Sequence, residues 1–329
     1  MTTPTRRRAA LASAVLLAAS LTACASQPES APAPAAADGG ATSEATGPVD
    51  AGELTVTHAQ GTTTVPVDPE RVLTFDLAAL GTLEQLGVDV TGVPKANLPG
   101  DLAKYAGEEY LDIGTLFEPD YEAVNAAEPD LIIVTSRSAP ALPELDKIAP
   151  TIDLSNDWTD FYGSNIANIR TLGEIFDKTA EAEAAIAALD ARVEAVQAKA
   201  GELGTALIVL TSGGEVTAYG PGSRFGILHD TLGVTPAVED VEAATHGEAI
   251  SFEFILETNP DWLFVVDRDA ATGEGGAAAA EVLDNELVAQ TTAAQQDQIV
   301  YVDSIAWYIL GGGLVALDAM IAEVEAVLG

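Results

Sequence analysis

The chain has 329 residues, with 14 Lys and Arg against 51 Asp and Glu, and a formal net charge of −37 at pH 7. Such an acidic surface argues against nucleic acid and anionic lipid headgroups as direct partners, and it favours solubility outside the cell. Because cations are so scarce, any clustered arginines become informative.

The first 23 residues are typical of a secretory signal peptide. Three arginines at 6–8 precede an apolar run at 9–21 that is too short to span a bilayer as a mature helix. The run ends in Leu-Thr-Ala-Cys, which resembles a bacterial lipobox cleaved before Cys24. Cys24 is the only cysteine, so it has no intramolecular disulfide partner, whereas a lipidated cysteine needs none. We expect an extracytoplasmic protein that is lipid-anchored to the cell membrane; ordinary cleavage beside an incidental cysteine is the alternative.

Residues 24–52 begin with the cysteine and continue as Ala, Pro, Gly, Ser and acidic residues without a periodic apolar pattern. Such a segment cannot bury a core, and it is interpreted as a flexible linker. Removal of residues 1–23 leaves 11 basic against 51 acidic side chains, a net charge of −40. About 275 residues remain for the folded part, enough for two domains of ordinary size.

The folded part alternates short β-branched runs with helical stretches, which is typical of βαβ units and mostly parallel sheets. We predict strands at 53–57, 63–67, 71–75, 89–93, 130–135 and 151–154, and then at 205–211, 215–219, 262–266 and 298–302. The expected fold class is α/β, with two Rossmann-like lobes joined by one long rigid α-helix. The N-terminal lobe is placed at 53–176, the connecting helix at 177–203 and the C-terminal lobe at 204–329.

The connecting helix is predicted from one narrow apolar stripe within residues 178–204. The residues of this stripe follow one another at spacings of three, four and three positions, and they are Ile186, Leu189, Val193 and Val196. Gly201 and Gly204 supply a stop signal. Roughly 22 residues at 1.5 Å each cover about 33 Å, the diameter of a small domain. This favours a strut between two lobes, and the alternative is a surface helix within one domain.

A repeat with an offset of 131 residues relates the two halves. YEAVNAAEPDLIIVTSR at 121–137 lies over FEFILETNPDWLFVVDR at 252–268, so that the aromatic residue, the Glu, the Pro-Asp turn, the apolar strand and the terminal Arg coincide. A period this long is not a solenoid repeat and suggests two lobes of like topology.

Arg137 and Arg268 are the equivalent arginines of this repeat, each at the carboxyl end of a predicted parallel strand. Ligands of open α/β sheets bind at that edge. We therefore expect both guanidinium groups to point into one cleft between the lobes. The alternatives are a local ion pair of Arg268 with Asp267 or Asp269, and a solvated loop position for Arg137.

Three further segments carry candidate ligand-binding residues. Arg224 lies in the glycine-rich loop YGPGSRFGILHDTLG, which has neither the P-loop nor the dinucleotide-binding spacing; it contacts a ligand or caps the loop. Trp307 and Tyr308 follow the last predicted strand and precede three glycines. This pair either stacks on a flat ligand and offers a phenolate to a hard cation, or forms a packed corner. His246 lies in a polar loop before the second repeat unit. It is placed to reach the cleft, and the alternative is a loop histidine without a role in binding.

Catalytic motifs are absent from the sequence. It has no G-x-S-x-G, no H-E-x-x-H and no cysteine available as a nucleophile. Acid pairs carry little information in so acidic a chain. We expect a binding protein and no enzyme; an extracytoplasmic hydrolase that uses a carboxylate pair is the alternative from another class, and a structural surface lipoprotein is a third.

With these features together, residues 53–329 resemble the helix-backbone (class III) substrate-binding lipoproteins of ABC importers for ferric siderophores, haem and cobalamin. The likeness is greatest to the branch that binds petrobactin and bis-catecholates, through GSRFG at 222–226, THGEAISFE at 245–253, Arg268 after its strand, and WYILGGG at 307–313. The resemblance implies that Arg137, Arg224 and Arg268 surround the catecholate oxygens, and that His246 and Tyr308 ligate Fe(III) of the bound siderophore. It implies no intrinsic cofactor.

The same resemblance implies partners. A monomer would deliver its ferric siderophore to an ABC transporter permease, docking through one acidic residue per lobe. Glu118 matches the first position, and Glu248, offset from it by 130 residues, is the candidate for the second. A haem or cobalamin receptor is the alternative ligand class, although three arginines favour a small polyanion. A Zn or Mn receptor would need more His and carboxylate ligands.

Overall fold

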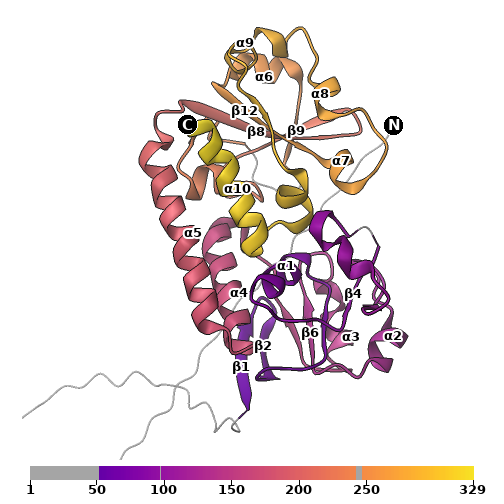
Figure 1. Cartoon of the computed structure of the whole chain (residues 1–329). Helices are drawn as coiled ribbons and strands as arrows, with labels where there is room; N and C mark the ends of the chain where they lie inside the picture. The colour runs from indigo at the N-terminus through magenta and orange to yellow at the C-terminus, as the bar shows by residue number, and fades with distance from the viewer. Residues whose placement is uncertain (1–51, 97, 242–246) are drawn as a thin grey trace, which may run out of the picture. The chain divides into compact units, whose positions relative to one another are not determined.

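Two β-sheets with corresponding strand orders form the two halves of the computed structural model (Figure 1). The structure describes residues 52–96, 98–241 and 247–329, and every structural statement below concerns these residues. They all belong to one compact unit. The predicted signal peptide, Cys24, most of the predicted linker and His246 lie outside the described residues.

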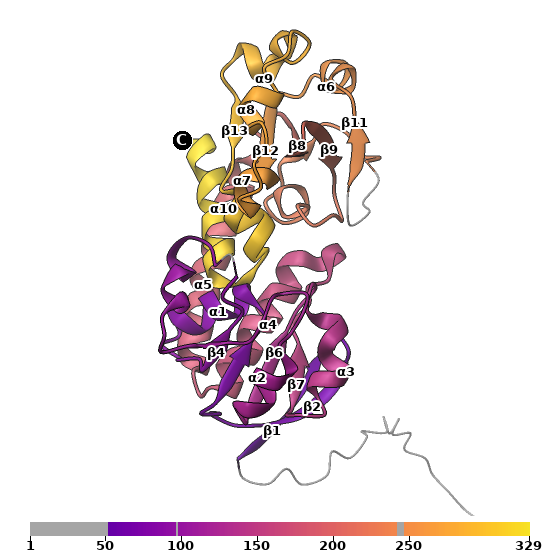
Figure 2. The same ribbon diagram turned by 90° about the vertical axis from the view of Figure 1, so that its right-hand side faces the viewer.

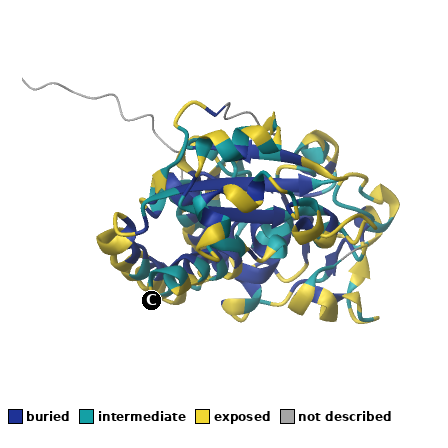
Figure 3. Cartoon of the chain, turned by 90° about the horizontal axis from the view of Figure 1, so that it is seen from above, coloured by how far each residue is buried: buried dark blue, intermediate teal, exposed yellow. Residues whose placement is uncertain are grey.

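The first sheet is entirely parallel, in the order β5-β4-β3-β6-β7. An antiparallel hairpin of β1 and β2 contacts its β7 edge. The strands of this half are β1 (Glu53–His58), β2 (Gly61–Pro66), β3 (Val72–Thr74), β4 (Gly92–Val93), β5 (Leu111–Asp112), β6 (Leu131–Val134) and β7 (Thr151–Asp153). Its central strands β3 and β6 are fully buried, as their largely apolar sequences require. Figure 3 shows buried strands in dark blue, with more exposed helices and loops around them.

The second sheet is mixed, in the order β11-β9-β8-β12-β13, with β10 paired to β8. β8, β10, β12 and β13 pair in parallel, whereas β9 and β11 are antiparallel. The strands are β8 (Thr205–Ser212), β9 (Glu215–Tyr219), β10 (Thr235–Pro236), β11 (Glu248–Ile250), β12 (Trp262–Asp267) and β13 (Ile299–Tyr301). Together the sheets confirm the predicted α/β class.

All ten predicted strands are present, and β5, β10 and β11 were not predicted. The repeat is also visible in the topology. β6 and β12 each stand fourth in their sheets, each preceded by a short helix, α2 (Tyr121–Ala126) or α6 (Phe252–Thr258). The two arginines differ locally, because Arg137 lies in a turn whereas Arg268 begins the helix α7 (Arg268–Thr272).

The remaining α-helices cover the sheets, as the views in Figures 1 and 2 show. They are α1 (Leu77–Gln85), α3 (Leu142–Leu145), α4 (Phe161–Ile175), α5 (Thr179–Ala200), α8 (Ala279–Val282), α9 (Thr292–Gln295) and α10 (Gly313–Leu328). None of the helices in the described part of the chain is both long enough and apolar enough to cross a bilayer.

The long helix α5 connects the halves, because it follows α4 and leads into β8. It has 22 residues, and its predicted stripe is its buried face, which packs against α4 and α10. One hydrophobic cluster continues from Val72 and Leu131 of the first sheet to Ile208 and Phe264 of the second. Helices and sheets therefore share a continuous core.

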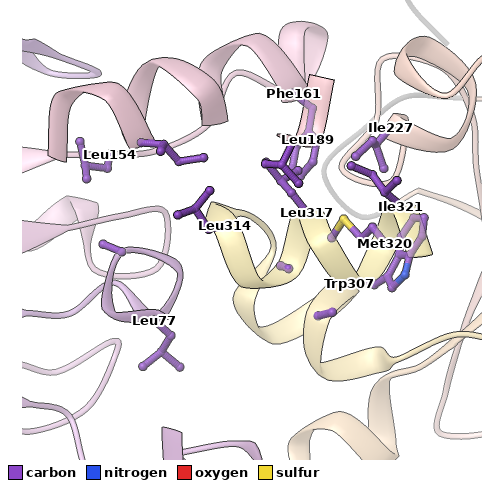
Figure 4. Close-up of a cluster of buried hydrophobic side chains, with 14 of the residues drawn as sticks. Leu77, Leu154, Phe161, Leu189, Ile227, Trp307, Leu314, Leu317, Met320 and Ile321 are labelled. Atoms are coloured by element: carbon purple, nitrogen blue, oxygen red, sulfur yellow. The ribbon is translucent and has the colours of Figure 1, made fainter. Parts of the chain in front are cut away.

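The C-terminal helix α10 joins this core from the second half and packs against α1, α4 and α5 (Figure 4). Its first-turn N–H groups have no partner within the helix. Side chains of the first half accept hydrogen bonds from these groups instead. Gly313 N donates to Asn165 Oδ1 at 2.8 Å, and Leu314 N donates to Thr82 Oγ1 at 3.1 Å. The start of α10 is thereby fixed to the first half.

Glycine at 313 is needed for this approach. Its φ is +70°, and a Cβ there would lie 2.5 Å from the carbonyl oxygen of Ala78. We expect Gly313→Ala to lower the free energy of unfolding by roughly 2–4 kcal/mol. Gly311→Ala is the matched control, since its φ is +59° with no atom within 4 Å of an added Cβ; it should lose about 1 kcal/mol. Urea denaturation of both variants tests this, and equal losses would contradict it.

Candidate functional site

A cavity of about 560 Å³ lies at the carboxyl ends of β3, β6 and β7. From the first half it is lined by Asp76, Arg137, Asn156 and Trp158, among others; from the second half by Arg224, Tyr308 and the residues that follow. This volume lies within the range of small-molecule binding sites. The carboxyl edge of the first sheet, where the sequence predicts ligand binding, is thus part of a cavity.

Main-chain carbonyls of one helical turn take the place of acidic partners for two arginines. The turn, η6 (Ile305–Leu310), is π-helical and ends at Gly311 with φ +59°. The last carbonyls of a helix lack intrahelical partners. Tyr308 O accepts from Arg137 Nη2 at 3.0 Å and from Arg224 Nη2 at 3.1 Å. Arg137 Nη1 also donates to Ile309 O at 3.3 Å. Arginines from both halves thus converge on one peptide segment.

The ring of Tyr308 lies among all three predicted arginines. The guanidinium carbon of Arg224 is 4.5 Å from the ring centroid, that of Arg137 5.6 Å and that of Arg268 5.9 Å. These distances are within cation–π range. In addition, Arg268 Nε donates to the Tyr308 hydroxyl at 3.0 Å. The structure therefore brings Arg137, Arg224, Arg268 and Tyr308 together, and their contact with a ligand stays a prediction.

The three arginines differ in how their charge is compensated. Arg268 pairs with Glu274 at 2.8 Å and Asp269 at 3.6 Å, so the predicted local ion pair also exists. In the part of the chain that the structure describes, Arg137 and Arg224 form no ion pair. Two arginines without a carboxylate partner among the described residues therefore face the cavity in a chain with a large excess of acids.

Arg224 is the most constrained of the three. Burial, and next the charge of Arg137, lower its pKa, although the group stays charged as arginines do. Its Nε is buried without a hydrogen-bond partner among the described residues. A buried donor without a partner is destabilising, more so on a charged group. An anion in the cavity would relieve this.

The sequence predicts that Arg137 and Arg268 point into one cleft as equivalent residues. The structure places Arg268 differently. Arg137 lines the cavity, whereas Arg268 is not among its lining residues. The Arg268 side chain is 29% exposed, and it reaches the cavity through the Tyr308 hydroxyl. Its Nη1 donates to Glu274 Oε2 at 2.8 Å and to Ser212 Oγ at 3.2 Å.

The expectation for Trp307 is wrong in this structure. Its side chain is 1% exposed and packs in the core beside Met320 and Ile321 (Figure 4). Its Nε1 donates to Glu323 Oε2 at 2.6 Å. Neighbouring residues of a helical turn face different directions, so Tyr308 meets the arginines while Trp307 enters the core. A buried indole cannot stack on a ligand.

Trp158 is an aromatic residue of the cavity that the sequence analysis missed. It is half-buried, lines the cavity and stacks on Phe161 with centroids 5.9 Å apart and planes at 11°. Phe117, which is 70% exposed, also lines the cavity. Trp158 follows the carboxyl end of β7. Its position after a predicted strand is the feature of the sequence that could have identified it as a cavity residue.

Asp76 is a buried carboxyl group in the cavity wall. It caps α1, accepting from the N–H groups of Ala78 and Ala79 at 2.8 and 3.1 Å. Burial raises its pKa to about 7, against the lowering effect of these two hydrogen bonds. The charge of this wall therefore changes near neutral pH.

The remaining predicted residues have varied placements. Glu118 and Glu248 are both exposed, one in each half, as docking residues would need to be. No group of three or more His, Cys, Asp or Glu in the described ranges could hold a metal ion. Because His246 lies outside those ranges, its predicted role as an iron ligand stays a prediction.

Comparison with known proteins decides the family. The model of the family described as periplasmic binding protein matches residues 72–306, more than half of the chain. The chain belongs to this family. Its members bind substrates and are not enzymes, which leaves the hydrolase alternative without support.

Three relatives illustrate the similarity. The petrobactin-binding protein YclQ of Bacillus subtilis is 39% identical over 278 residues, covering 83% of this chain and 87% of YclQ; its crystal structure superposes with a TM-score of 0.81 over 84% of this chain and 98% of that chain. The ferric-anguibactin-binding protein FatB of Vibrio anguillarum is 35% identical, covering 82% and 86%. The catecholate-siderophore-binding protein VctP of Vibrio cholerae is 35% identical with a TM-score of 0.80, covering 83% and 99%.

The pKa of Asp76 yields a prediction with a defined sign. The folded chain retains this proton up to a pH of about 7, whereas the unfolded chain loses it near the ordinary value of 3.8. Stability therefore falls as pH rises between these values. Asn caps helices equally well, so the gain in stability from Asp76→Asn should be larger at pH 8 than at pH 5, by roughly 1–3 kcal/mol.

Urea denaturation at both pH values measures this difference. Asp157→Asn is the control: hydrogen bonds from the Thr159 hydroxyl and N–H lower the pKa of this exposed cap, so it does not titrate between pH 5 and 8. A gain from Asp76→Asn that is the same at both pH values would contradict a raised pKa.

Proposed function

We propose that the chain is an extracytoplasmic receptor that binds a ferric catecholate-type siderophore in its cavity and delivers it to an ABC importer permease. One observation carries the proposal: Arg137 and Arg224 line a cavity of about 560 Å³ and pair with main-chain carbonyls in place of carboxylates. Partly compensated guanidinium groups favour an anionic ligand. A ferric bis-catecholate is a net anion of suitable size.

The relatives support this ligand class. The names of YclQ, FatB and VctP specify petrobactin, ferric anguibactin and catecholate siderophores. Iron is then the cargo of a bound chelate and no resident cofactor. A chain this acidic would repel an anion at long range, but the Debye length of about 8 Å at physiological salt screens distant carboxylates while the cavity arginines act at contact.

Tyr308 and His246 are the proposed protein ligands for iron when a tetradentate siderophore leaves two positions open. Fe(III) is a hard ion, and a tyrosinate supplies the anionic oxygen that it prefers. Arg268 Nε donates to the Tyr308 hydroxyl at 3.0 Å, so this arginine fixes the position of the phenol oxygen. Trp158 adds an aromatic wall for a catechol ring. We further propose the lipid anchor at Cys24 and docking of a monomer to the permease through Glu118 and Glu248.

Binding is tested by titrating the protein with a ferric tetradentate bis-catecholate while tryptophan fluorescence is recorded. We expect saturable quenching and no turnover of the ligand. Trp158 lies in the cavity wall, whereas Trp262 lies on β12 away from it, so Trp158→Phe should lose more of the quenching than Trp262→Phe. Absence of quenching in the wild type would contradict the function; equal losses in the two variants would contradict the placement of the ligand beside Trp158.

Arg137→Gln should weaken binding of the same complex by about 1–3 kcal/mol, the range for hydrogen bonds to charged groups. Arg170→Gln is the matched control, since it removes the same charge from an exposed pair with Glu183. Isothermal titration calorimetry measures both affinities. Equal affinities for the two variants would remove Arg137 from the ligand site.

A further inference from the structure

Arg268 has a carboxylate partner, whereas Arg137 and Arg224 have none among the residues that the structure describes. Glu274 Oε2 accepts from Arg268 Nη1 at 2.8 Å, and Oε1 accepts from Nη2 at 3.4 Å. The two oxygens thus occupy the edge of the guanidinium that a chelating dianion would also use. The third arginine is thus already bound to a carboxylate of the chain itself.

Asp269, the other acid near Arg268, is committed elsewhere. It is 7% exposed, and its carboxylate accepts from Gly213 N at 2.8 Å and from Ser212 Oγ at 3.3 Å. Its distance from Arg268 Nη1 is 3.6 Å, too long for a strong hydrogen bond. Asp269 therefore fixes the turn after β8. Its carboxylate is held there and cannot move toward Arg268 or away from it.

Glu274 is free to move where Asp269 is not. Its side chain is 59% exposed, and Arg268 is the one hydrogen-bond partner of its carboxylate among the described residues. It lies between α7 and α8, next to Gly273, whose φ is +69°, and to Gly275, where an added Cβ would meet no atom within 4 Å. Glycines on both sides let the backbone adopt several conformations.

We propose that Glu274 is a built-in counter-anion that holds Arg268 outside the cavity and sets how much negative charge a ligand needs to engage this arginine. The inference rests on the proposed function. Partly exposed ion pairs are weak, so the concentrated charge of a catecholate chelate can replace Glu274. A neutral ferric complex gains nothing from Arg268 and leaves the pair intact. Glu274 is thus a residue that determines specificity by ligand charge.

A purely structural role predicts the opposite result. If the pair with Glu274 only orients Arg268 toward the Tyr308 hydroxyl, loss of the carboxylate misplaces Arg268 and weakens binding. A counter-anion, in contrast, competes with the ligand, so its loss strengthens binding. The direction of the change distinguishes the two roles.

The experiment measures the affinity of the full chain for a ferric tetradentate bis-catecholate and for a neutral ferric trihydroxamate. Glu274→Gln keeps the size of the side chain and removes its charge. It should bind the anionic complex about twofold to fivefold more tightly than the wild type, the range of partly exposed ion pairs, and leave any affinity for the neutral complex unchanged. Glu183→Gln removes the same charge from the exposed pair with Arg170 and should change neither affinity.

A double-mutant cycle tests whether Glu274 acts through Arg268. In an Arg268→Gln background, Glu274→Gln should give no further gain, since the competing pair no longer exists. A gain that persists there, unchanged or weaker binding by Glu274→Gln, or an equal gain by Glu183→Gln would each overturn the inference while leaving the proposed function intact. Absence of binding by the wild type and by Glu274→Gln alike would overturn the proposed function itself.

Discussion

The site depends on arginines that are held in place without neutralising their charge. Tyr308 O and Ile309 O fix the Arg137 and Arg224 guanidinium groups through partial charges, and the Tyr308 ring faces all three arginines. A carboxylate in the same positions would orient them equally well but would cancel the field that an anionic ligand needs. This arrangement keeps the site cationic in a chain whose overall charge is strongly negative.

The rest of the fold positions that turn. η6 contributes Tyr308, and three glycines lead from it into α10, whose first N–H groups bond to Asn165 and Thr82 of the first half. Asn156 Nδ2 also donates to Gly311 O at 3.0 Å. The carbonyls that hold Arg137 are therefore attached to both halves of the molecule, and these halves share one hydrophobic core.

Much of the fold followed from patterns that burial imposes. Short β-branched runs predicted ten strands, and the stripe through Ile186 and Val193 predicted the buried face of α5. β5, β10 and β11 have the sequences LD, TP and EAI, which contain no run of β-branched residues to recognise. The repeat placed Arg137 and Arg268 after equivalent strands, but it could not show that Arg268 would begin a helix and turn toward Glu274.

Within the site, the sequence identified scarce residue types better than abundant ones. Arg137, Arg224 and Tyr308 were found because arginines and aromatics are rare. Glu274 was missed because one acid among 51 is not conspicuous. The sequence pointed to Trp307, whereas the tryptophan at the cavity is Trp158. The orientation of the Trp307 side chain depends on the packing of Met320 and Glu323 against it, and residue spacing does not encode that packing.

The central claim is tested most directly by locating the iron. Crystals of the protein with a ferric bis-catecholate, measured at the iron absorption edge, give the iron position from anomalous differences. We predict one iron inside the cavity, with the guanidinium groups of Arg137 and Arg224 facing the chelate oxygens. An iron bound on the outer surface, with the cavity empty and both arginines still on their carbonyls, would contradict it.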